Sequence, residues 1–214
     1  MARVYGQHCG LAQALDLVGE RWALLIVREL MAGPRRYTDL AAGLVSIPSN
    51  VLAARLRELE SAGLIARRRL DPPAASTVYE LSARGHELEP AVTALARFGM
   101  RVLPPAAEGR PFRAHWLVLA IMARFDAAVA AELSESYEFE VPGEALVSLT
   151  VVEGRPEVRM GPAVEPAVRI VADAPTLLGM TEGSVDPAQA LARGAVIEGD
   201  PSALVRLAEI LPAP

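Results

Sequence analysis

The apolar residues in the first part of the chain recur at helical spacing. In "GLAQALDLVGERWALLIVRELMAGP" they fall three or four positions apart, and Gly33-Pro34 follows as a stop signal. The pattern predicts two helices that meet near Gly19 and whose apolar faces are formed by Leu11, Leu15, Val18, Trp22, Leu25, Ile26 and Leu30.

The next segment predicts a helix-turn-helix. "RRYTDLAAGL" forms a short helix beginning near Thr38, and after a tight connection a longer helix runs to about Ala62 within "SIPSNVLAARLRELESAG". We expect Ser46 or Ser49 to cap the start of this longer helix, and Gly63 to end it.

Two strand-like runs then predict a hairpin. "LIARRRL" and "TVYEL" are joined by "DPPAAS", and a helix-turn-helix followed by a hairpin is a winged helix, mostly α with a β-hairpin wing. Ser82 is expected to cap a further helix over "ARGHELEPAVTALARFGMRVL". So small a domain could not easily bury the apolar stripe of that helix alone, which consists of Leu88, Val92, Leu95 and Val102.

The second half of the chain has a different pattern. "PPAAEGRP" lacks apolar periodicity and is typical of a linker, whereas residues 112–133 carry a strongly apolar helical face. Alternating runs such as "SYEFEVP" and "ALVSLTVVEGRPEVRMG" predict strands, and helical runs follow them. These patterns predict an α+β domain with a mostly antiparallel sheet, and a division into domain 1–103, linker 104–111 and domain 112–214.

The longer helix of the helix-turn-helix has two contrasting faces. Leu52, Leu56 and Leu59 share one face and form core, while the other has two small alanines, Ala53 and Ala54, between Asn50 and Arg57. Small residues flanked by polar ones allow a backbone to approach base edges in a major groove. We therefore expect Asn50 to pair with adenine, Arg57 with guanine or phosphate, and Ser49 with phosphate.

The charge distribution separates the two halves. Residues 1–110 contain 14 Arg against 11 Asp and Glu, a charge of +3, whereas residues 111–214 contain 7 against 15, a charge of -8. Every basic residue is Arg, which offers phosphate a planar fork. GC-rich codon usage is the simpler explanation for the absence of Lys.

The basic positions around the hairpin predict contacts with a nucleic-acid backbone. Because strand side chains alternate, Arg67 and Arg69 share one face and Arg68 has the other. Arg35 and Arg36 precede the short helix, where the domain would cross the backbone, although one of them could instead pair with Asp39. Arg55 also belongs to the candidate set; alone, this helix could equally be an ordinary charged surface formed by Arg55, Arg57, Glu58 and Glu60.

Three blocks in the first half resemble the HxlR-type branch of the MarR-like winged-helix transcriptional regulators. They are "HCGLAQALDLVGERWALLIVRELMAGPRRYTDL", "IPSNVLAARLRELESAGLIARR" and "VYELSARGHELEPAVTALARFG". The resemblance implies a homodimer, joined through its first and last helices, that binds double-stranded operator DNA and represses transcription. It also implies that Cys9 is a candidate sensor of oxidants or electrophiles; its position at a helix start would favour the thiolate, but a lone cysteine can also be inert.

The end of the chain resembles the sterol-carrier-protein-like domains. The segment "VRIVADAPTLLGMTEGSVDPAQALARGAVIEGDPSALVRL" carries this resemblance, which implies a lipid or another apolar small molecule held between sheet and helices. Such a domain could alternatively have a filled core and serve in dimer stabilisation or protein contacts. The candidate pocket residues, which could equally be plain core, are Trp116, Met122, Phe125, Phe139, Met160, Leu177 and Met180.

Other functional classes find little support in the sequence. The three histidines are scattered, and no Gly-rich phosphate loop, HExxH or GxSxG motif occurs, so neither an enzyme, a cofactor nor a metal site is expected. The single cysteine excludes an internal disulfide, and no segment has the apolar length of a signal peptide or membrane span. We expect a cytoplasmic protein.

Overall fold

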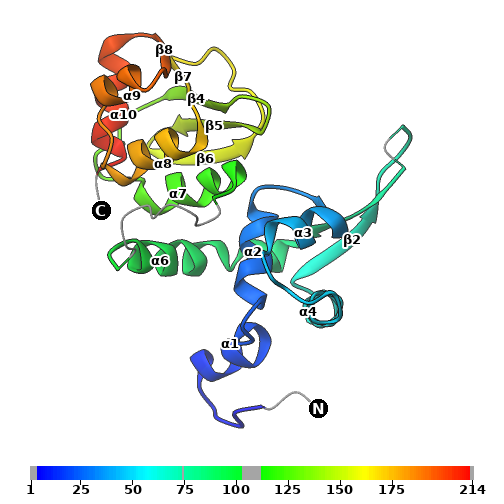
Figure 1. The fold of residues 1–214 in the computed structure, drawn as a ribbon. Helices are drawn as coiled ribbons and strands as arrows, with labels where there is room; N and C mark the ends of the chain where they lie inside the picture. The colour runs from blue at the N-terminus through cyan, green and yellow to red at the C-terminus, as the bar shows by residue number, and fades with distance from the viewer. Residues whose placement is uncertain (1–3, 74, 103–111, 213–214) are drawn as a thin grey trace. The chain divides into compact units, whose positions relative to one another are not determined.

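The computed structural model describes residues 4–73, 75–102 and 112–212 (Figure 1). The chain divides into two compact units, Met1–Val92 and Thr93–Pro214, each of which has its own core. The predicted linker, residues 104–111, lies outside the described residues.

The first unit contains the predicted helix-turn-helix. Two helices meet at Gly19 as expected, and the next two form the helix-turn-helix: α1 (Gly10–Val18), α2 (Ala23–Met31), α3 (Tyr37–Gly43) and α4 (Ser49–Ser61). Their shared core consists of branched aliphatic side chains that are almost fully removed from water, which is the main force holding such a small unit together. It includes Ile26, Leu40, Leu44, Leu52, Leu56 and Leu59.

The ends of α4 agree only partly with prediction. Gly63 follows the helix with a φ of 69°, a left-handed conformation that suits glycine, so the predicted stop is confirmed. The predicted serine cap is wrong, because Pro48 occupies the capping position and no side chain caps the helix. Ser46 instead forms part of the preceding turn with a φ of 69°, and Ser49 is already the first helical residue.

The wing has one more strand than the sequence predicts. β2 (Ile65–Arg69) and β3 (Thr77–Leu81) pair antiparallel as expected, and the two-residue strand β1 (Arg35–Arg36) pairs with the other side of β3. A strand of two residues is too short to leave an alternating pattern.

The helical region after the wing is interrupted. Ser82 accepts a hydrogen bond from the backbone N–H of Gly85, so the predicted cap is confirmed. The helix nevertheless breaks after one turn, into α5 (Ala83–His86) and α6 (Glu89–Met100).

The second unit is built on a five-stranded sheet in the order β6-β5-β4-β7-β8. Only β4 and β7 pair parallel among the described strands, so the sheet is mostly antiparallel as predicted. The strands are β4 (Glu135–Val141), β5 (Ala145–Val152), β6 (Arg155–Met160), β7 (Val168–Val171) and β8 (Val196–Gly199).

Helices cover one face of this sheet (Figure 1). Alternation along the strands turns Tyr137 and Phe139 toward the helices, where both are buried, while Glu140 lies on the open face. The covering elements are the 3-10 helix η1 (Ala114–Trp116) and the helices α7 (Leu117–Arg124), α8 (Ala174–Glu182), α9 (Pro187–Ala192) and α10 (Pro201–Ile210).

The long helix predicted over residues 112–133 is wrong in its length. Helix α7 ends at Arg124, because Phe125 adopts an extended ψ of 124°. The Asp126 carboxylate then accepts the backbone N–H groups of Ala128 and Val129, and this local bond offers the backbone an alternative to the helix. The apolar residues beyond Arg124 continue the helical spacing without continuing the helix.

Two glycines with nearly equal backbone angles provide a test of the packing at β8. Gly199 has a φ of 119°, and a Cβ there would lie 2.1 Å from the carbonyl oxygen of Ala167; Gly161 has a φ of 117° and open space around it. We expect Gly199→Ala to lower the free energy of unfolding by about 1–3 kcal/mol more than Gly161→Ala, because only the former adds a clash with backbone to the backbone strain. Denaturant unfolding followed by circular dichroism measures both, and equal losses would contradict the expectation.

Candidate nucleic-acid interface and apolar pocket

The outward face of α4 carries the side chains predicted to read bases. Asn50 and Arg57 are exposed and Ala53 and Ala54 half-buried, while the leucine stripe on the opposite side is buried. The start of α4 is also fixed to α3, because the Tyr37 hydroxyl donates a hydrogen bond of 3.0 Å to the carbonyl oxygen of Ser49. The helix that carries the polar face is therefore fixed at its start by this hydrogen bond and along its length by the buried leucines.

Two arginines on α4 have different surroundings. Arg55 pairs with Glu58, one turn further on, and lies 3.8 Å from Glu20, so acidic neighbours offset its charge. Within the described part of the chain, no acidic side chain pairs with Arg57, which is exposed. Arg57 is thus the α4 arginine available to an anion.

The wing separates its three arginines in the same way. Arg68 lies across the hairpin from Glu80 and binds it through two nitrogens, with Nη2 at 2.8 Å and Nε at 3.0 Å. This hydrogen bonding raises the pKa of Arg68 and lowers the pKa of Glu80. Arg67 and Arg69 point to the other face, are exposed, and have no acidic partner among the residues that the structure describes.

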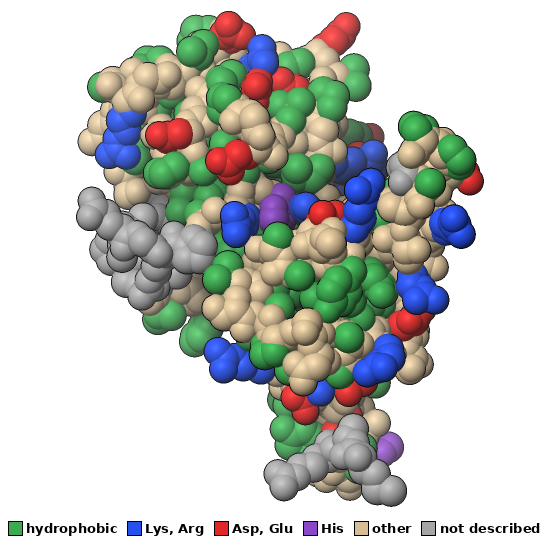
Figure 2. Space-filling view, turned by 45° about the vertical axis from the view of Figure 1, so that its right-hand side comes forward, with side chains coloured by type: hydrophobic (Ala, Val, Ile, Leu, Met, Phe, Trp, Pro, Cys, Tyr) green, Lys and Arg blue, Asp and Glu red, His purple; other side chains and the backbone are tan. Residues whose placement is uncertain are grey.

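The arginines of β1 lie at the base of the wing. Arg35 is half-buried opposite Tyr79, and its Nη2 has no hydrogen-bond partner within the described residues. Arg36 is exposed, and its backbone N–H, not its guanidinium, bonds the Asp39 carboxylate at 3.0 Å. Figure 2 shows arginine side chains spaced along the side of this unit that carries the hairpin, with acidic side chains between some of them.

Cys9 immediately precedes α1 and is exposed. Its side chain forms no capping hydrogen bond, yet the backbone N–H groups of Ala12 and Leu11 lie close enough to lower the pKa of the thiol. The lowered pKa increases the fraction present as reactive thiolate at neutral pH.

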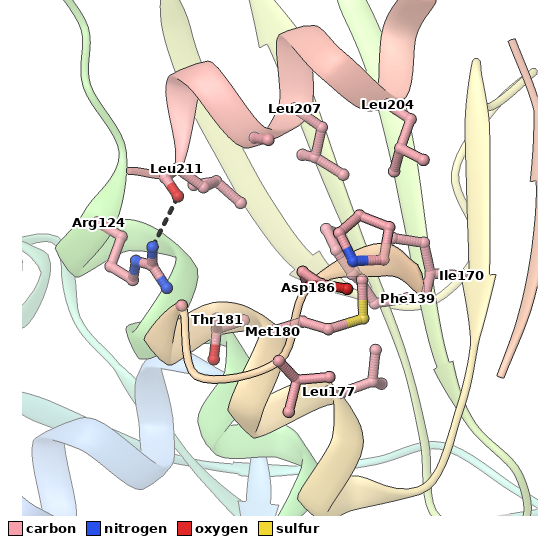
Figure 3. A pocket seen from close by; sticks show the side chains of 14 residues that line it. Arg124, Phe139, Ile170, Leu177, Met180, Thr181, Asp186, Leu204, Leu207 and Leu211 are labelled. Atoms are coloured by element: carbon pink, nitrogen blue, oxygen red, sulfur yellow. Dashed lines mark hydrogen bonds between the residues drawn. The ribbon is translucent and has the colours of Figure 1, made fainter. Parts of the chain in front are cut away.

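The second unit contains an apolar pocket of about 240 Å³. Figure 3 shows Leu204 and Leu207 of α10, with Leu211 just after that helix, on one side of it, and Leu177 and Met180 of α8 on the other. The sheet closes the pocket with its inward-facing side chains, Phe139 of β4 and Ile170 of β7.

Three of the seven predicted pocket residues line this space, namely Phe139, Leu177 and Met180. The other four lie elsewhere: Trp116 packs edge-on against Phe112, Met122 is half-buried on α7, Phe125 is buried just after α7, and Met160 ends β6 opposite Val147. The prediction favoured large aromatic and methionine side chains and missed the contribution of α10. Leu204 and Leu207 of this helix, with Leu211 just after it, have the helical spacing that would have indicated a lining face.

The polar groups at the pocket wall already form hydrogen bonds within the protein. The Arg124 guanidinium donates to the carbonyl oxygens of Leu211 at 2.7 Å and Pro212 at 2.8 Å, which fixes the end of α10 against the end of α7 (Figure 3). The Thr181 hydroxyl donates to the carbonyl of Leu178, and Asp186 caps α9. The pocket therefore offers a ligand mainly apolar contact.

The described residues contain no group of three or more His, Cys, Asp or Glu side chains placed to hold a metal ion. No described helix has both the length and the apolar character needed to cross a membrane.

The fold and the exposed polar face of α4 define the first unit as a winged helix-turn-helix of the kind found in DNA-binding transcriptional regulators. Residues 17–107 match the model of the HxlR-like helix-turn-helix family. The chain belongs to this family, and it is an HTH-type transcriptional regulator of the HxlR type. The pocket lies in the part of the chain beyond the family match.

Two relatives that match in sequence agree with this assignment, and one solved structure is also similar to this chain. The uncharacterised HTH-type transcriptional regulator Rv3095 of Mycobacterium tuberculosis is 40% identical over 111 residues, which cover 52% of this chain and 68% of that protein. An uncharacterised HTH-type transcriptional regulator of Synechocystis is 34% identical over 94 residues, 44% of this chain and 70% of its own. The solved structure of the reduced form of YodB from Bacillus subtilis is 27% identical, with a TM-score of 0.40 and coverage of 47% of this chain and all of that one.

The contrast within the wing leads to a test with any duplex DNA, since non-specific binding is electrostatic. We expect replacement of both Arg67 and Arg69 by Ala to reduce the slope of log affinity against log salt by about 1.8 per bound copy, because two phosphate contacts are lost. The matched control, Arg68→Ala, should change the slope by less than half as much, since Glu80 already holds that charge. Fluorescence anisotropy over a salt series measures both, and a change of about 0.9 or more for Arg68→Ala, the effect of one full phosphate contact, would refute the assignment.

Proposed function

We propose that this chain is a homodimeric repressor whose operator binding is controlled by a small apolar molecule held in the pocket of the second unit. The observation that carries the proposal is the pocket of about 240 Å³, lined by leucines of two helices and by inward residues of the sheet. A tightly filled core would have no such space, because protein interiors pack nearly as densely as organic crystals.

The DNA contacts in this proposal come from two elements. Helix α4 enters the major groove, where Asn50 and Arg57 meet base edges and Ser49 a phosphate. Arg67 and Arg69 of the wing, with Arg35 and Arg36 at its base, add affinity through the sugar-phosphate backbone. Arg55 and Arg68 remained candidates from sequence, but their acidic partners favour a structural role for both.

The homodimer is supported by exposed apolar side chains on the first and last helices of the first half. Leu11 on α1 is 69% exposed, and Phe98 on α6 is 66% exposed, with Leu95 and Val102 also open to solvent. Large apolar side chains that are exposed at neighbouring positions of one helix, as Leu95 and Phe98 are on α6, indicate an interface. A second copy of the chain would cover them.

The size of the pocket defines the class of effector. A cavity of roughly 150 Å³ can hold benzene, and sites for drug-sized ligands have roughly 300–1,000 Å³, so this pocket lies between the two. The arrangement of sheet and helices supports a sterol-carrier-protein-like domain over residues 112–214, separated by a linker at 104–111 from a winged-helix domain over 1–103. Only a difference in effector affinity between the DNA-bound and released arrangements can drive release.

Native mass spectrometry with matched tryptophan variants tests the proposal. We expect a species of twice the chain mass that carries an additional small mass, and that mass should disappear on denaturation. Leu207→Trp should abolish the additional mass because the new side chain fills the pocket, whereas Val205→Trp, on the same helix but 59% exposed, should retain it. A dimer without bound mass that also fails to bind toluene or hexanol in a thermal-shift titration would overturn the effector model.

A second candidate mechanism is a thiol switch at Cys9, in which the second unit would stabilise the dimer or contact other proteins. It is favoured by the exposure of the thiol and by the lowered pKa. Under this mechanism Cys9→Ser should bind duplex DNA like the wild type and lose sensitivity to hydrogen peroxide, since the hydroxyl cannot be oxidised to a sulfenic acid. Anisotropy before and after peroxide treatment measures this, and unchanged sensitivity of Cys9→Ser would exclude the switch.

A further inference from the structure

A second apolar hollow adjoins the pocket. It has a volume of about 220 Å³, and its lining includes Val168 of β7, Leu191 of α9 and Ile197 of β8. Two residues, Pro187 and Leu204, line both this hollow and the first pocket. The two spaces therefore share a wall.

The two hollows lie one after the other along β7 and along α10. Val168 lines the second hollow and Ile170 the first; they are two residues apart on the same face of β7, which places them about 7 Å apart. Above them, Pro201 at the start of α10 lines the second hollow, and Leu211, just past the end of this helix of about 15 Å, lines the first.

The Leu204 side chain lines both hollows, as Pro187 does, and so lies between them. It is half-buried. The helix that carries it is fixed: Arg206 pairs with Glu135 of β4 and with Asp200, and Asp200 caps the helix through the N–H of Ser202. A change of rotamer at Leu204 would open the passage while α10 stays in place.

We propose that the second hollow is an extension of the pocket, and that the ligand is one elongated apolar chain that lies along α10 and passes Leu204. The inference rests on the proposed function and adds the shape of the ligand and the residues that set its length. Neither hollow alone reaches the roughly 300 Å³ at which typical ligand sites begin, whereas the two together exceed it.

The outer end of this extended site defines what it accepts. Leu191 is 53% exposed although it lines an apolar hollow, so a chain that reaches it would remove an open leucine from water. Glu198 and Asp200 also line this end and would repel a carboxylate. The end of the chain at the second hollow is therefore not anionic.

Straight-chain alcohols of two lengths, hexanol and decanol, test the inference by calorimetric titration of the full chain. Each methylene that leaves water for an apolar site raises affinity about fourfold, so decanol should bind the wild type at least tenfold more tightly than hexanol. Leu191→Gln should lower decanol affinity about tenfold and leave hexanol affinity unchanged. Val205→Gln, an equally exposed apolar position on α10 that lines neither hollow, is the control and should change neither.

Leu204→Ala provides an independent readout, because removal of the side chain between the hollows should increase the decanol-to-hexanol affinity ratio. If both alcohols bind but neither Leu191→Gln nor Leu204→Ala changes that ratio, the extension is refuted while the effector pocket stands. If neither alcohol binds the wild type, the pocket itself and the effector model fail with it.

Discussion

The burial of three leucines on α4 is the constraint on which the recognition surface depends. Leu52, Leu56 and Leu59 are at most 2% exposed, and a helix that buries this stripe must turn Asn50 and Arg57 outward. The hydrogen bond from Tyr37 to the first turn of α4 adds a fixed starting point. The side chains that we propose to read bases are thus oriented by apolar packing beneath them, which tolerates changes in the polar face without loss of the fold.

Fewer arginines of the first unit are available to an anion than their number indicates, and these lie on particular faces of α4 and of the wing. Arg55 and Arg68 belong to ion pairs within the fold, whereas Arg57, Arg67 and Arg69 have no acidic partner among the described residues. On the wing, the pair between Arg68 and Glu80 also joins the two strands. One face of the hairpin therefore stabilises the wing, and the other presents positive charge.

Much of the architecture could be predicted from the sequence, because periodicity and glycine positions directly reflect local structure. The helix-turn-helix, the hairpin, the Ser82 cap and the mostly antiparallel sheet all follow from such patterns. The errors arose where a local bond competed with periodicity, as at Asp126, or where a strand was as short as β1. The pocket lining depends on which side chains from distant segments meet, and the spacing of leucines in α10 identifies a buried face without revealing whether that face is filled.

The groups that hold the pocket together have a consequence for how the protein could receive a signal. Arg124 and Arg206 fix the end and the middle of α10, and neighbouring Glu135 raises the pKa of Arg206 further above its already high value. Asp200, whose pKa is lowered chiefly by the backbone N–H of Ser202, contributes stability above its ordinary pKa, which is lost only as the pH falls through the lowered value. The contacts named here join guanidinium, carboxylate and backbone groups, which keep their charges throughout the neutral range. A change of pH within that range would leave these contacts in place, and a change in this frame would have to come from what enters it.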